Sequence, residues 1–117
     1  MATNGNQMKL GLAFGVHHAP VAAPAKVVRQ VETAAQALAI SIAAAGCKLD
    51  YIGACVGKSR AYVSRLQNGK CPIPARLVMP LCAATGSLLL RQFIELESAL
   101  ETVNDVERLA RMLREAA

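Results

Sequence analysis

Two short helical segments, residues 49–56 and 59–68, are separated by only Gly57 and Lys58. A connection of two residues is too short for the crossover that joins parallel strands, whereas it fits a tight corner between two helices. Gly57 can adopt a positive φ in such a corner at little steric cost. Ser59, directly after the corner, has the side chain of a helix N-cap. The spacing therefore predicts a helix-turn-helix.

The apolar pattern outside this motif is also helical. Residues 25–45 predict a single helix, because their apolar side chains recur at intervals of three and four. Another helix is expected near residues 77–85, where Pro80 either delays its start or kinks it. Residues 88–113 predict one long helix or two. With 3% aromatic residues and no Trp, the chain is expected to be all-α, a compact bundle packed through small side chains.

The composition divides the chain into three regions. Residues 1–24 mix Gly, Asn, Pro and Ala without periodicity, so we expect a flexible leader there. Residues 25–86 then form a helix-turn-helix domain, and residues 87–117 a C-terminal helical segment. Residues 10–16 resemble a signal-peptide core only poorly, because they contain two glycines. No apolar run approaches the roughly 20 residues that span a bilayer, so we expect no membrane association and a cytoplasmic location.

Positive charge is concentrated in the middle of the chain. Residues 26–91 hold nine Lys and Arg against two acids, whereas residues 92–117 hold three against six. A basic body attracts polyanions, because each phosphate that it neutralises releases condensed counterions. Charge alone does not distinguish DNA from RNA or from an anionic membrane surface.

The cysteine spacing argues against a metal site. Cys47, Cys55, Cys71 and Cys82 lie 8, 16 and 11 residues apart, and the two histidines are adjacent at positions 17 and 18. A structural zinc site usually needs two close pairs of ligands, so we expect reduced thiols and no metal. The sequence pattern also lacks a nucleophile–base pair, a glycine-rich phosphate loop and paired acids. We therefore expect no cofactor and no enzymatic activity.

The second helix of the motif is expected to present polar groups along one face. Val63 and Leu66 would face inward, toward Ile52 and Val56 of the first helix. The outward positions then carry two guanidinium groups, a hydroxyl and an amide, which are groups that hydrogen-bond base edges and phosphates. These outward residues are Arg60, Ala61, Ser64, Arg65 and Asn68.

Residues 57–70, with the sequence GKSRAYVSRLQNGK, resemble the turn, recognition helix and following loop of the lambda-repressor/Cro-like (XRE) helix-turn-helix family. The similarity extends over about residues 48–86. It implies that residues 59–68 enter the major groove of double-stranded DNA and that the protein acts as a dimer.

The resemblance also assigns contacts to individual positions. Arg60, Ala61, Ser64 and Arg65 would face bases, and Asn68 and Lys70 would face phosphate. Lys58 and Ser59, which precede the helix, complete the predicted DNA-binding set. Lys58 replaces a commonly apolar turn residue, and it either reaches a phosphate or is simply solvated. Leu49 departs from the family, which often has glutamine there, and Tyr62 is expected only to pack.

These features predict a sequence-specific transcriptional regulator, a repressor of the phage or mobile-element type. Because one short recognition helix reads few base pairs, we expect a homodimer with half-sites about one helical turn apart. The C-terminal segment carries an apolar stripe at intervals of three and four, which fits an intramolecular core and a dimer interface equally well. The stripe consists of Leu100, Val103, Val106, Leu109 and Leu113.

Two other functions fit parts of the pattern. Residues 57–64 also resemble the helix-turn-helix of ParB-like partition proteins, although the chain has no room for the nucleotide-binding domain of full-length members. The Asn68-Gly69 pair favours the repressor family over this alternative. From a different class, the protein could be an interaction module, such as an antitoxin or antirepressor, that holds a protein partner through residues 100–113.

Overall fold

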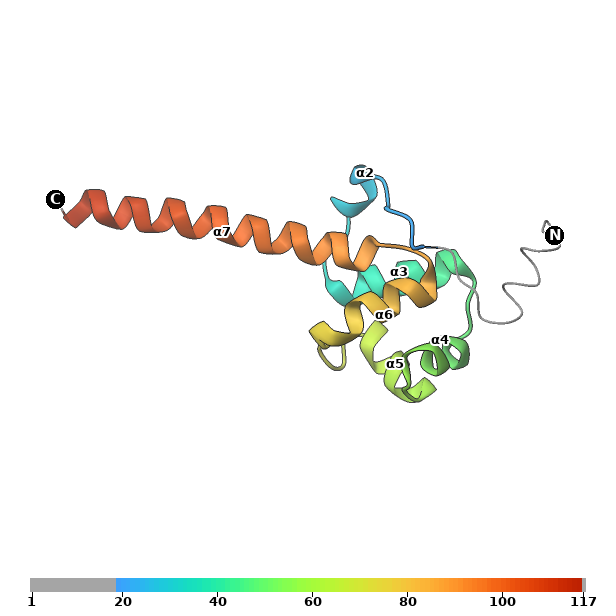
Figure 1. Cartoon of the computed structure of the whole chain (residues 1–117). Helices are drawn as coiled ribbons and strands as arrows, with labels where there is room; N and C mark the ends of the chain where they lie inside the picture. Colours follow the sequence, from blue (N-terminus) through green and yellow to red (C-terminus); the bar gives the residue numbers. More distant parts are fainter. Residues whose placement is uncertain (1–18, 117) are drawn as a thin grey trace.

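The computed structural model describes residues 19–116, and these residues form six helices (Figure 1). The helices are α2 (Ala25–Val28), α3 (Ala34–Ala45), α4 (Leu49–Val56), α5 (Arg60–Gln67), α6 (Ala75–Thr85) and α7 (Leu89–Ala116). Within this range the only strand-like pairing is an isolated bridge between Val21 and Ser87. The all-α prediction is therefore confirmed.

The helices α3 to α7 share one hydrophobic core. α3 packs against α5, α6 and α7, while α4 packs against α5 and α6. α4 and α5 lie together on one side of the body, and α2 lies on the other, against the start of α7 (Figure 1). The largest side chains that are less than 2% exposed are Leu38, Ile52, Val63, Leu66, Leu81, Cys82 and Leu90. Helix-on-helix burial of this kind is what holds α4 and α5 in place.

The prediction of one helix over residues 25–45 is wrong, because α2 ends at Val28 and α3 begins only at Ala34. The Thr33 hydroxyl accepts a hydrogen bond from the Gln36 backbone N–H at 3.0 Å. The side chain of Gln36 reaches back to accept one from the Glu32 backbone N–H at 2.6 Å. This reciprocal cap resembles a capping box, and the Thr-x-x-Gln spacing was the sequence signal for it. The apolar periodicity concealed this break.

Residues 19–24 are held against the body, unlike the flexible segment expected there. The Val21 N–H donates to the Gly86 carbonyl at 3.0 Å, and the Leu88 N–H donates to the Val21 carbonyl at 2.9 Å. Gln92 accepts from the Ala23 N–H at 2.8 Å and donates to the Ala23 carbonyl at 3.1 Å. These hydrogen bonds therefore join the residues that precede α2 to the junction between α6 and α7. The predictions made for residues 1–18 lie outside the described residues.

The two C-terminal helices resolve the alternatives left open by the sequence. α6 starts before Pro80, at Ala75, so the proline does not delay it. α7 is one continuous helix of 28 residues. Only its first turns are buried, through Leu89, Leu90 and Phe93, and the rest projects from the body (Figure 1).

Within residues 19–116, no single helix combines the length and apolarity needed to cross a bilayer. α3 and α4 reach those limits only when taken together, and their axes are bent by 113°.

We expect Thr33→Ala to lower the free energy of unfolding by about 1 kcal/mol, because the first turn of α3 loses its cap. Thermal denaturation followed by circular dichroism measures the change. Thr33→Ser keeps the hydroxyl and serves as the control, with a stability close to that of the unsubstituted protein. Equal stability of the alanine variant would show that α3 starts without help from this cap.

Candidate nucleic-acid interface

The corner between α4 and α5 depends on two glycines. Gly57 has a φ of 73°, in the left-handed region, and ends α4. The Lys58 N–H then donates to the Gly53 carbonyl at 2.8 Å. A Cβ on Gly53 would lie 2.5 Å from the Lys58 carbonyl oxygen, so only glycine fits this approach without movement. The corner thus places α5 in a fixed orientation relative to α4.

Both ends of α5 are closed by local hydrogen bonds. The Ser59 hydroxyl accepts from the Tyr62 N–H at 3.1 Å, which confirms Ser59 as the N-cap. At the other end, the Asn68 amide donates to the Ser64 hydroxyl at 3.3 Å. The Lys70 N–H donates to the Arg65 carbonyl at 2.9 Å. Because Ser59, Ser64 and Asn68 already take part in these bonds, a ligand would have to share or replace some of them.

The predicted contact residues are arranged on the surface of α5 and its flanking turns. Val63 and Leu66 are fully buried, which fixes the rotation of the helix about its axis. Ser64 is half-buried, and the other predicted contact residues are exposed: Lys58, Ser59, Arg60, Ala61, Arg65, Asn68 and Lys70. The structure therefore places the whole set on α5 and the turns that flank it, and their contact with DNA stays a prediction.

Tyr62 has a role that the sequence did not indicate. The Lys58 ammonium lies 5.6 Å from the centre of the Tyr62 ring, and the Arg65 guanidinium lies 5.8 Å from it. Cations at this distance are attracted to the ring face. Lys58 precedes the N-cap and lies outside α5, so only the three-residue spacing between Tyr62 and Arg65 was a helical signal for this arrangement. The Tyr62 ring thus attracts both cations.

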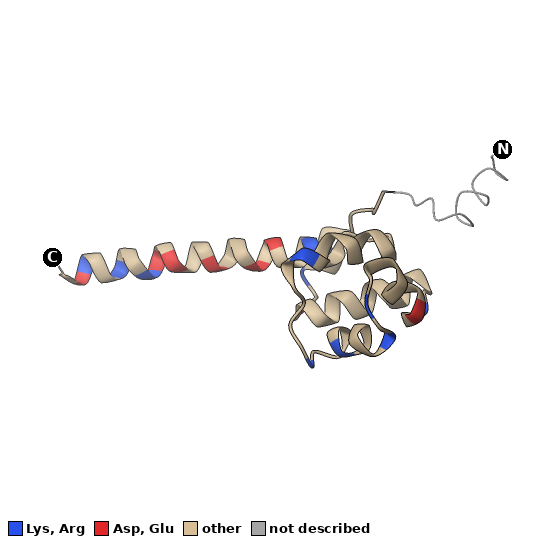
Figure 2. Cartoon of the chain, turned by 60° about the horizontal axis from the view of Figure 1, so that its bottom comes forward, with Lys and Arg blue, Asp and Glu red and all other residues tan. Residues whose placement is uncertain are grey.

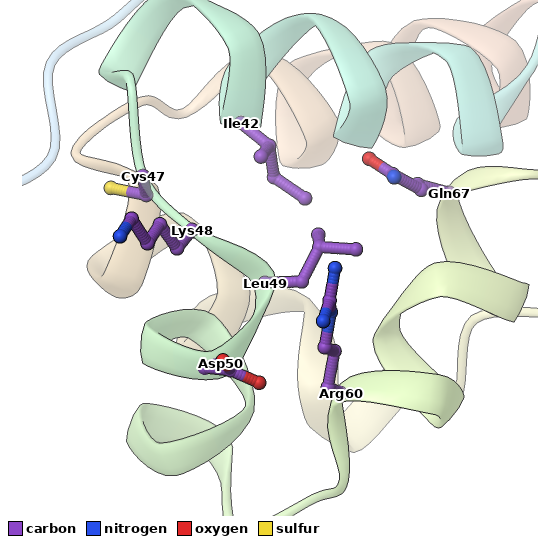
Figure 3. A pocket seen from close by; sticks show the side chains of 7 residues that line it. All are labelled: Ile42, Cys47, Lys48, Leu49, Asp50, Arg60 and Gln67. Atoms are coloured by element: carbon purple, nitrogen blue, oxygen red, sulfur yellow. The ribbon is translucent and has the colours of Figure 1, made fainter.

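Arg60 does not point straight outward as expected. Its side chain extends toward Leu49 and Gln67, into a pocket of about 550 Å³ between α3, α4 and α5 (Figure 3). Leu49 occupies the position where the resembled family often has glutamine, and it contributes an apolar wall. Lys48 and Asp50 also line the pocket, but the Lys48 side chain points away from Arg60 (Figure 3).

The Cys47 thiol also lines this pocket. Burial, followed by the nearby Cys55 thiol, raises the pKa of the Cys47 thiol above its usual value. A protonated thiol is a weak nucleophile and a weak ligand. All four cysteines are free, and only Cys82 is buried. Among residues 19–116, no three His, Cys, Asp or Glu side chains are grouped so that they could hold a metal ion.

Charge around α5 is strongly positive. Between residues 48 and 76 the chain carries six Lys and Arg, and Asp50 is the only acid. Figure 2 shows these basic positions on α5 and the adjoining loops, while the acidic residues gather on α7. A surface that carries many basic and few acidic side chains attracts an anionic polymer.

No protein-family model, curated protein or solved structure matches this chain. The observations thus support a small all-helical protein, with six helices in the described part of the chain, and identify no family.

We expect Gly53→Ala to destabilise the protein by about 1–3 kcal/mol, because the added methyl group meets the Lys58 carbonyl. In an ordinary helix interior the same change would stabilise by about 1 kcal/mol, so the sign is diagnostic. Chemical denaturation measures it, with Ala54→Ser, at the next and exposed position of α4, as the control. A more stable Gly53→Ala variant would mean that the corner is looser than described.

Proposed function

We propose that this protein binds double-stranded DNA with sequence preference and regulates transcription, with α5 as the recognition helix. The observation that carries the proposal is the placement of α5: a capped, exposed helix at a fixed corner, within the most basic part of the body. The likeness of residues 57–70 to the XRE-type motif supports the same function, and a repressor is its simplest form.

The dimensions of α5 suit the major groove. A B-form major groove admits an α-helix, and Arg side chains there can donate two hydrogen bonds to guanine. Arg65 is the strongest candidate for such a contact, because it is exposed and Tyr62 already restricts its side chain. Restricting an Arg side chain before binding lowers the entropy lost on binding. Ala61 and Ser64 would lie beside it, where they leave room for a base edge.

The flanking residues would fix the register of the helix on the duplex. Lys58 and Lys70 lie at opposite ends of α5 and are exposed, so each can reach a phosphate. Asn68 would act with Lys70. At the other end, Ser59 would contribute mainly by keeping the first turn of α5 intact.

Arg60 would need a change of rotamer to reach a base. In the structure it lies along the pocket beside Leu49, but it is exposed. Exposed side chains exchange rotamers within picoseconds to nanoseconds. From its position in the pocket, the Arg60 guanidinium would instead contact a phosphate.

The proposal is tested by selecting bound duplexes from a random library and then measuring affinities for the enriched sequence. We expect Arg65→Ala to weaken binding by about 1–3 kcal/mol and to relax the preference at one base pair. Arg29→Ala removes the same charge from the opposite side of the body, at the end of α2, and should change affinity much less. An equal loss in both variants would mean that only net charge matters.

Salt dependence separates phosphate contacts from base contacts. We expect Lys70→Ala to weaken binding to all duplexes by a similar factor and to reduce the slope of log affinity against log salt by about 1. Titrations at several salt concentrations, on the selected and on an unrelated duplex, measure both effects. If no sequence is enriched and binding is absent even at low salt, the proposed function is wrong.

A further inference from the structure

The C-terminal part of α7 carries an apolar stripe that no other part of the described chain covers. Of its members, Leu100, Val103 and Leu109 are 54–55% exposed, Val106 is 62% exposed and Leu113 is 75% exposed. Within residues 19–116 the stripe is therefore not part of an intramolecular core. Most helical stability in proteins comes from packing an apolar face, so a helix of this kind indicates a missing partner.

The stripe follows a heptad repeat. Leu96, Val103 and Ala110 are seven residues apart, and Ala99, Val106 and Leu113 form a second such series three residues later. Apolar residues at alternating intervals of three and four form the seam between two supercoiled helices. Leu100 and Leu109 flank this seam on its two sides.

The repeat is also symmetric about one point, midway between Asn104 and Asp105. Four pairs of apolar positions at equal distances on either side of this point carry the same residue, whereas the polar positions between them do not match. The matched pairs are Val103 with Val106, Leu100 with Leu109, Ala99 with Ala110, and Leu96 with Leu113. Two copies that run in opposite directions and cross at this point would therefore place valine against valine, alanine against alanine and leucine against leucine. Each layer of the seam would then hold two side chains of the same type.

Charge selects the same orientation. Residues 95–107 contain five acids and no Lys or Arg, whereas residues 108–114 contain three Arg and no acid. Figure 2 shows the two blocks as successive red and blue bands along α7. Antiparallel copies place the acidic block of each helix alongside the basic block of the other. Parallel copies would place like charges side by side, which is unfavourable.

We propose that α7 is a self-association surface on which a second copy of this chain packs antiparallel, centred between Asn104 and Asp105. Size matching within the seam and the opposite charges of its two halves identify the partner as another α7. The pairing requires no nucleic acid, so it is tested separately from the function proposed above.

Sedimentation equilibrium over a range of concentrations tests the association. The unsubstituted chain should approach twice its mass of 12.3 kDa as the concentration rises. The double variant Val103→Lys/Val106→Lys, in the middle of the seam, should remain monomeric. Met112→Lys changes an equally exposed apolar residue off the seam and should associate as the unsubstituted chain does. Because all three positions are exposed, unchanged thermal unfolding of the body excludes misfolding as the cause.

Engineered cysteines test the orientation. Chains carrying Ala99→Cys are mixed with larger, tagged chains carrying Ala110→Cys, and the mixture is oxidised mildly. Antiparallel pairing predicts a cross-linked heterodimer and little linkage within either variant alone. The unsubstituted chain reports any linkage through its native thiols. A monomer at every concentration, or preferential linkage of Ala99→Cys to itself, would overturn the proposal, as would association only with a different protein.

Discussion

The close backbone approach between Gly53 and Lys58 is the constraint on which the rest of this structure depends. It joins the end of α4 to the start of α5 by a main-chain hydrogen bond, at a distance that excludes any side chain on Gly53. With this corner set, Ile52 and Val63 face the same core and the polar side of α5 faces solvent. Orientation of the exposed face is thus a consequence of core packing, and a rigid face is what specific recognition requires.

Much of the helical framework could be predicted from the sequence, because short loops and caps are local signals. Residues within one or two helical turns of each other determine such signals. The bounds of α4, the Ser59 cap and the apolar stripes are examples. The division between α2 and α3 was missed because a local cap competed with an uninterrupted apolar period, and the cap prevailed. The path of residues 19–24 depends on Gln92, far along the chain, and no local pattern indicates such a contact.

The sequence indicated which residues of α5 face solvent, but not how their side chains are arranged. The side chains that face outward from α5 follow from helical periodicity and the positions of Val63 and Leu66. The side-chain direction of Arg60 depends on the space left between three helices, and Lys58 and Arg65 each lie near the ring of Tyr62. Both effects arise from tertiary packing and rotamer choice, which a pattern of residue types does not specify.

The length of α7 has a consequence for how far apart two bodies can be. About 16 residues separate the first buried turn of α7 from its centre of symmetry, which is about 24 Å of helix. In the antiparallel pair proposed above, the two bodies would lie on opposite sides of this centre, about 48 Å apart along the helices. This is longer than the roughly 34 Å between successive major-groove faces on one side of a duplex. If α5 binds duplex DNA as proposed, a dimer of this shape would suit two separated stretches of duplex better than two adjacent half-sites.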